Sequence, residues 1–135
     1  MIAHAIVPAD LGSGAHAGFI RASWTRGARE DWHTLLDLSR RPDVRMLVAH
    51  LPDDPESLLG WACCRGDALV WVYSRDLGGR VRGRGLASAL LSALRLDPKG
   101  PLRALYWSPW AALLTRTGHW RLYYEPPGDK ETACA

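Results

Sequence analysis

The residues best suited to chemistry form an arginine- and glycine-rich stretch, Arg82-Gly83-Arg84-Gly85-Leu86-Ala87-Ser88, which follows the apolar run 69–73. Glycines let the main chain approach a ligand closely, and the free amides of a helix's first turn point at that ligand with the positive end of the dipole. Arginines add charge-assisted hydrogen bonds in the forked geometry that phosphate oxygens accept. The stretch therefore predicts an anion site at the start of a helix.

Positive charge gathers at the same place. The chain has a formal net charge of +3, and residues 75–84, with four arginines and one aspartate, account for the same excess. Nucleic-acid binding would call for a broader basic face, so nucleic acid is not expected as a partner and DNA binding is the weakest hypothesis. The plain alternative to a ligand site is a solvated charged loop.

Apolar periodicity and turn residues outline the elements that must position this stretch. Asp10 is expected to cap the first helix. Residues 44–73 are expected to form three antiparallel strands, the first of them buried on both faces, and residues 51–57, with two prolines and three acidic residues, are expected to form a loop. The predicted strands are 2–7, 44–50, 58–65, 68–73, 102–107 and 119–124, and the predicted helices are 15–26, 31–40, 83–95 and one after Pro109.

Length and composition indicate one globular domain over residues 1–125, with a polar tail at 126–135. No window approaches the roughly 18 apolar residues of a membrane span, so a cytoplasmic location without a membrane partner is expected. Cys63, Cys64 and Cys134 have no zinc-ligand spacing, and no metal is expected. Most of the seven tryptophans are expected to fill the core, whereas Trp107 and Trp110 could form an exposed lip for a substrate or partner.

The element order, together with the motif Arg82-x-x-Gly85-x-Ala87, resembles the GNAT superfamily of acyl-CoA-dependent N-acyltransferases. A second frame, Arg80-x-x-Gly83-x-Gly85, fits the same pattern. The motif is neither a Walker A loop nor a dinucleotide fingerprint. The resemblance implies an α/β (α+β) fold in which a mixed, mainly antiparallel central sheet of about six strands is flanked by about four helices.

The resemblance also implies acetyl-CoA as cosubstrate and an unidentified amine, on a small molecule or a protein, as acceptor. The residues from Arg82 to Ser88 would hold the pyrophosphate of the coenzyme. Val72 and Tyr73 would splay from the fifth strand and pair with the pantetheine arm. The implied coenzyme-binding residues are Val72, Tyr73, Arg80, Arg82, Gly83, Arg84, Gly85, Leu86, Ala87 and Ser88.

One departure from the family concerns catalysis. Many members carry a tyrosine that protonates the leaving thiolate, and Leu114 stands at that place. The substitute catalytic candidates are Ser108 and Tyr106 as acids and Glu56 as base, with His50, His119, Tyr123 and Tyr124 behind them.

A looser similarity to short phage-encoded GNAT-like proteins is carried by the segments 19–24, 47–55 and 59–61. It leaves open a second hypothesis, a non-catalytic binding or structural protein of a phage virion. Under that hypothesis the partner is another phage structural protein, and a homodimer is a further open alternative.

Overall fold

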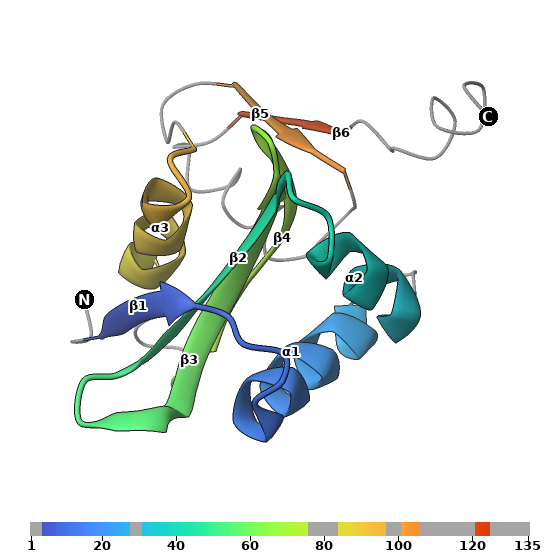
Figure 1. The fold of residues 1–135 in the computed structure, drawn as a ribbon. Coiled ribbons are helices and arrows are strands. Elements are labelled where there is room, and N and C mark those ends of the chain that lie inside the picture. The colour runs from blue at the N-terminus through green and yellow to red at the C-terminus, as the bar shows by residue number, and fades with distance from the viewer. Residues whose placement is uncertain (1–3, 28–30, 76–83, 97–100, 106–120, 125–135) are drawn as a thin grey trace.

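A six-stranded sheet is the centre of the fold (Figure 1). The computed structural model describes residues 4–27, 31–75, 84–96, 101–105 and 121–124. The strands are β1 (Ala5–Pro8), β2 (Val44–Leu51), β3 (Asp54–Arg65), β4 (Ala68–Ser74), β5 (Pro101–Ala104) and β6 (Arg121–Tyr124), and the helices are α1 (Gly14–Gly27), α2 (Trp32–Ser39) and α3 (Arg84–Ala93).

The order of the strands in the sheet is their order in the chain. The first four strands pair antiparallel, whereas β4 with β5 and β5 with β6 pair parallel. The parallel pairs require crossover connections, and α3 lies in the connection from β4 to β5. The mixed architecture expected from the sequence is therefore confirmed, with antiparallel pairing over its first four strands.

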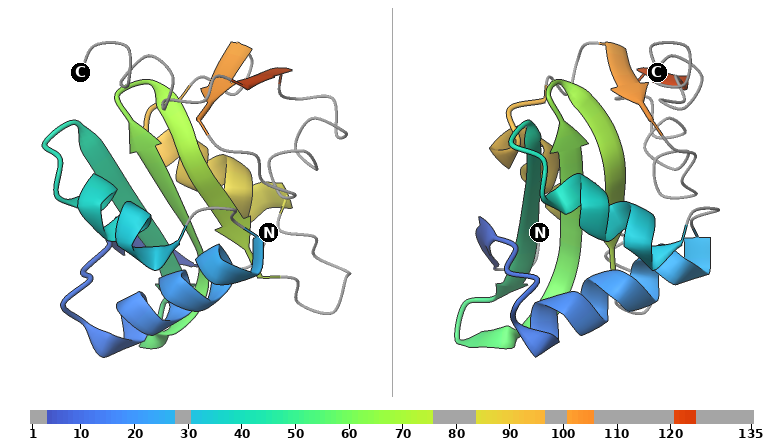
Figure 2. Two further views of the ribbon diagram at one scale, coloured as in Figure 1. Left: turned by 90° about the vertical axis from the view of Figure 1, so that its right-hand side faces the viewer. Right: turned by 45° about the vertical axis from the view of Figure 1, so that its right-hand side comes forward.

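Two hydrophobic cores lie on opposite faces of the sheet, one under α1 and α2 and the other under α3 (Figures 1 and 2). The arrangement explains the uninterrupted apolar run in β2, because Val48 packs in the first core and Ala49 in the second. Trp24, Trp61 and Trp71 are fully buried in the first core, so these three tryptophans fill space as expected.

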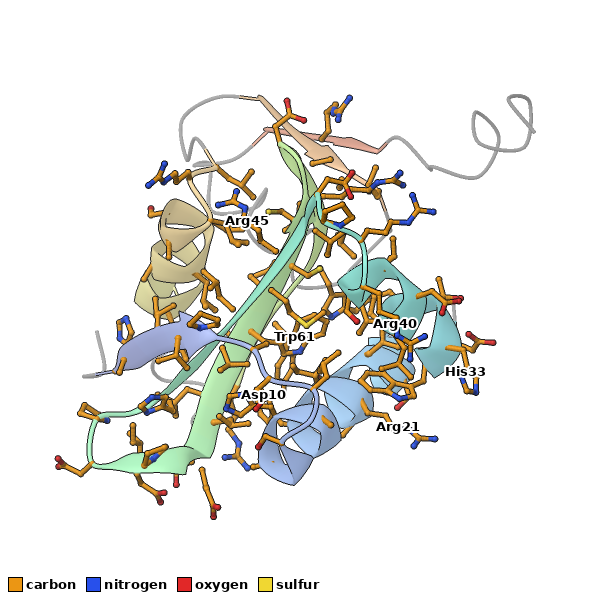
Figure 3. All side chains as sticks on the ribbon, viewed as in Figure 1. Asp10, Arg21, His33, Arg40, Arg45 and Trp61 are labelled. Atoms are coloured by element: carbon orange, nitrogen blue, oxygen red, sulfur yellow. The ribbon has the colours of Figure 1, made fainter. Side chains whose placement is uncertain are left out.

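A buried hydrogen-bond network joins α1 to β3. The indole Nε1 of Trp61 donates to Ser23 Oγ at 2.6 Å, and Ser23 Oγ lies within donating distance of the carbonyls of Phe19 and Ile20, at 3.0 and 3.1 Å. Figure 3 shows Trp61 between the sheet and α1. Because a buried indole N–H needs an acceptor, this bond sets the position of α1 along the strand.

The end of α3 is closed by a Schellman motif. Arg95 has a positive φ of 63°, its N–H donates to Ser92 O at 2.9 Å, and Leu96 N–H donates to Leu91 O at 3.0 Å. Arg45, on β2, donates to Leu94 O, which places a cation at the negative end of the helix dipole (Figure 3). The helix, predicted to reach residue 95, thus ends at Ala93 and is closed by main-chain bonds within residues 91–96.

Two local predictions were wrong. The segment 51–57 is not a loop throughout, because β3 begins at Asp54 after a turn at 52–53. Pro55 lies in the part of β3 that extends beyond the end of β4. Fewer hydrogen bonds to a neighbouring strand form there, so the N–H that proline lacks is not needed. Asp10 does not cap α1. Its Oδ1 accepts from Gly12 N–H at 2.9 Å within a turn, and α1 begins at Gly14, where the Ser13 carbonyl accepts the first helical bond.

The other predicted helices and strands match those of the structure to within a few residues, as far as the described residues reach. The described part of the chain contains three helices where about four were expected. The fourth, after Pro109, lies outside the described residues, as do Trp107, Trp110 and Cys134. Within the described ranges, no helix has the length and apolar character needed to cross a membrane.

Candidate functional site

The C-terminal half of β4 has a neighbouring strand on one side only, as far as the described residues show. Among the described residues, parallel pairing of β4 with β5 is confined to Leu69 opposite Ala104, reinforced by Leu105 N–H donating to Leu69 O at 2.8 Å. Figure 2 shows β5 and β6 beside the start of β4, next to the turn that joins β3 to β4. We call the β5-facing side of residues 70–74 the open edge.

The hydrogen-bond alternation of antiparallel strands tells which residues face the open edge. Arg75 N–H donates to Leu59 O at 2.7 Å, so Arg75 and Leu59 form a hydrogen-bonded pair. Because such pairs alternate, Tyr73 opposite Trp61 also directs its main chain toward β3. The N–H and C=O groups of Val72 and Ser74 consequently point to the open edge.

Helix α3 begins beside the same end of β4. Gly60 of β3 lies opposite Ser74, and a Cβ at Gly60 would lie 3.3 Å from Leu86 and 3.4 Å from Leu90, both on α3. The other end of the helix contacts Arg45, which pairs with Cys64 further along β3. The start of α3 therefore lies next to the open edge, and its first turn contains no acidic residue to oppose a bound anion.

The two faces of the sheet differ at the open edge. Val72 is fully buried on the α3 face. Tyr73 is half-buried on the α1 face, where its ring meets the ring of Phe19 edge-on with centroids 5.7 Å apart. A chain lying along the open edge would have an apolar helix below it and an aromatic pair above it.

Ser74 ends the open edge with a polar side chain. Its Oγ is buried and forms no hydrogen bond within the described part of the chain. By strand alternation this hydroxyl lies on the same face as Val72, toward α3. Buried hydroxyls without partners are uncommon, so the position asks for an explanation.

The structure brings together several of the residues predicted to bind the coenzyme. Val72 and Tyr73 lie in β4 just before its last residue, Leu86 is buried on α3, and the main chain of Arg84 to Ser88 forms the first turn of that helix. Only the main chain of Arg84, Gly85, Ala87 and Ser88 is described, and Arg80, Arg82 and Gly83 lie outside the described residues entirely.

The predicted catalytic residues are only partly described. Tyr106 and Ser108 lie outside the described residues, as do Leu114 and His119. The side chains of Tyr123 and Tyr124, on β6, are not described. Glu56 is exposed on β3, four residues from Gly60, the partner of Ser74, which puts it roughly 13 Å along the strand from the end of β4.

His50 is buried on β2 with its Nδ1 2.7 Å from Leu51 O. Because a carbonyl can only accept, Nδ1 carries the proton and Nε2 is left to act as base. Two strand spacings, about 10 Å, separate β2 from β4, so His50 would reach an amine at the open edge only through water.

Neither the acidic residues at 53–56 nor the buried thiols of Cys63 and Cys64 add a reactive group. Hydrogen bonds from Ser57 Oγ and Glu56 N–H hold the pKa of Asp54 below its usual range, so this carboxylate is ionised and stabilises the start of β3. Burial raises the pKa of the thiols of Cys63 and Cys64, which keeps both protonated at neutral pH. Over the described ranges, no group of three or more His, Cys, Asp or Glu side chains could hold a metal ion.

Sequence reasoning missed Gly60 and Ser74. Gly60 carried a usable signal, since a lone glycine inside an apolar strand indicates a close approach of another element. Ser74 carried none beyond being a polar residue at the end of an apolar run.

Comparison with known proteins returned no matching family model, no matching curated protein and no matching solved structure.

Proposed function

We propose that the protein is an N-acyltransferase of GNAT type that binds an acyl-CoA thioester, most simply acetyl-CoA, and transfers the acyl group to an amine. The observation that carries the proposal is the open edge of β4 next to the start of α3. An extended chain with amide groups can pair with the main chain of Val72 and Ser74, and a pyrophosphate can bind the amides of the first turn of α3. Pantetheine joined to a nucleotide offers both features in one molecule.

The reaction asks little of the side chains. The amine nitrogen attacks the thioester carbonyl carbon, the C–N bond forms, and the C–S bond breaks. The amine loses a proton and the departing sulfur gains one. Holding the thioester against a strand whose amides point toward the developing oxyanion supplies positioning and electrostatic stabilisation. Glu56 or His50 would take the amine proton through water, and Tyr106 or Ser108 would supply one to the sulfur.

Calorimetric titration with acetyl-CoA tests the proposal. Wild-type protein is expected to bind at micromolar concentration, and dephospho and desulfo analogues show which parts of the coenzyme are recognised. Gly85→Asp places a carboxylate in the first turn of α3 and is expected to abolish binding, whereas Gly85→Ala, which adds a methyl group without charge, keeps most of it. Circular dichroism verifies that both variants fold. Retained affinity in Gly85→Asp contradicts the proposal.

A second candidate is a non-catalytic GNAT-like binding or structural protein, with a phage virion as one setting. Leu114, in place of the usual general acid, favours it. Under this hypothesis the protein co-purifies with a stable partner or with virions, and no amine in a broad panel is acylated. Turnover of acetyl-CoA with a defined amine eliminates this candidate.

A further inference from the structure

Ser74 is the one described residue in which three features occur together. It ends β4 opposite Gly60, its main chain points to the open edge, and its hydroxyl is buried with no hydrogen bond among the described residues. The α3 residues facing Gly60 are Leu86 and Leu90, whose apolar side chains cannot accept or donate a hydrogen bond.

A buried hydroxyl without a partner destabilises the protein that carries it, because its bonds to water are lost and not replaced. An alanine at this position would avoid that cost and keep the strand. A hydroxyl at position 74 is therefore explained if a ligand completes its hydrogen bonding.

We propose that Ser74 is a coenzyme-binding residue whose hydroxyl hydrogen-bonds an amide group of the pantetheine arm as the arm pairs along the open edge of β4. The inference rests on the proposed function and deepens it. The hydroxyl can donate to an amide carbonyl or accept from an amide N–H, so it suits an amide in either orientation. It adds a side-chain contact on the α3 face to the main-chain contacts made by Val72 and Ser74.

The test compares two quantities in Ser74→Ala, the affinity for acetyl-CoA and the stability of the ligand-free protein. Losing one neutral hydrogen bond should weaken binding roughly 2- to 12-fold. The stability of the ligand-free protein should stay the same or rise, because no bond is broken there. Ser74→Cys keeps a side chain of similar size, but its thiol is a much weaker hydrogen-bond donor, so it is expected to show the same loss of affinity. This variant replaces Ser74→Ala if the alanine variant folds poorly.

Ser39→Ala is the matched control. Ser39 Oγ donates to Leu36 O at 2.6 Å on α2, on the opposite face of the sheet from α3. Removing this hydroxyl should leave the affinity for acetyl-CoA unchanged and should lower stability slightly, the reverse of the pattern expected at Ser74.

A nucleotide fragment, 3′-phosphoadenosine 5′-diphosphate, distinguishes binding of the nucleotide end of the coenzyme from binding of its pantetheine arm. Its affinity should be the same for wild type and Ser74→Ala, since the fragment lacks pantetheine. An equal loss for the fragment and the whole coenzyme overturns the inference. So does unchanged acetyl-CoA affinity in Ser74→Ala, or a loss of ligand-free stability without a loss of affinity. Absence of binding by the wild type is a different result, because it refutes the proposed function itself.

Discussion

Replacing Gly60 by alanine tests how closely β3, β4 and α3 approach at the candidate site. A Cβ at Gly60 would lie 2.6 Å from the main-chain oxygen of Tyr73, nearer than non-bonded carbon and oxygen atoms come, and 3.3 Å and 3.4 Å from Leu86 and Leu90. The leucine side chains can rotate away. The Tyr73 oxygen belongs to a paired strand, so it moves only if the end of β4 moves.

The expected cost follows from two opposing effects. Overpacking a close-packed interior costs about 1–3 kcal/mol, whereas replacing glycine by alanine gains about 0.4–1 kcal/mol by restricting the unfolded chain. Gly60→Ala should therefore lower the free energy of unfolding by up to about 2.6 kcal/mol. Because the displaced atoms lie at the end of β4, it should also weaken the binding of acetyl-CoA.

Gly18→Ala is the control for the same chemical change. Gly18 is exposed in α1 with nothing within 4 Å of its added Cβ, so alanine there should stabilise the protein by about 0.8–1 kcal/mol through helix propensity. Urea unfolding followed by tryptophan fluorescence reports both variants, since Trp24 and Trp61 are fully buried. If Gly60→Ala is as stable as Gly18→Ala, the close approach of β4 and α3 to β3 is refuted.

Three further predictions concern elements that support the site. Arg95→Gly should raise the free energy of unfolding by about 1 kcal/mol in urea unfolding, since Arg95 holds a positive φ that costs a side chain about 1–2 kcal/mol; lower stability would contradict the Schellman ending of α3. Ser23→Ala should cost about 1–3 kcal/mol by depriving the buried Trp61 indole of its acceptor, and an unchanged denaturation midpoint would argue against that bond. Hydrogen bonds from Thr34 lower the pKa of Asp31 below its ordinary value, so the carboxylate's contribution to stability is complete above about pH 4 and is lost as the pH falls through the lowered pKa. Asp31→Asn should remove this part of the loss of stability in acid, measured by denaturation between pH 2 and 6. An unaltered dependence of stability on pH would refute the prediction.

Local pattern was enough to predict the first four strands and the three described helices. The turn at Gly66, with a φ of 59°, and the apolar runs on either side of it determine the β3–β4 hairpin. The same reasoning failed at residues 54–57, because Pro55 is a strand breaker only where its missing N–H would be needed. Whether a neighbouring strand needs that N–H depends on how far β4 extends, which the local sequence does not contain.

The candidate site was predicted in part for the same reason. The glycines and arginines before α3 carry their chemistry in the sequence, whereas the open edge arises from the pairing of strands distant in the chain. Which of Val72 and Tyr73 points to that edge depends on the register of β3 against β4, including a bulge between Cys63 and Cys64. The Ser74 hydroxyl has no hydrogen bond among the described residues, and the α3 side chains nearest to its strand partner Gly60 are Leu86 and Leu90; no local pattern contains either fact.

Under the proposed function, binding and turnover would depend on different parts of this fold. Pairing along the open edge would use the main chain of β4, and the proposed anion site would use the main chain at the start of α3, so neither would depend on a side chain that protonates the leaving thiolate. A chain with Leu114 in place of that acid can therefore keep full affinity for acetyl-CoA and still transfer the acyl group slowly or not at all. For this reason affinity, together with its loss in Gly85→Asp and Ser74→Ala, tests the site, and acylation of an amine decides between the enzyme and the non-catalytic protein.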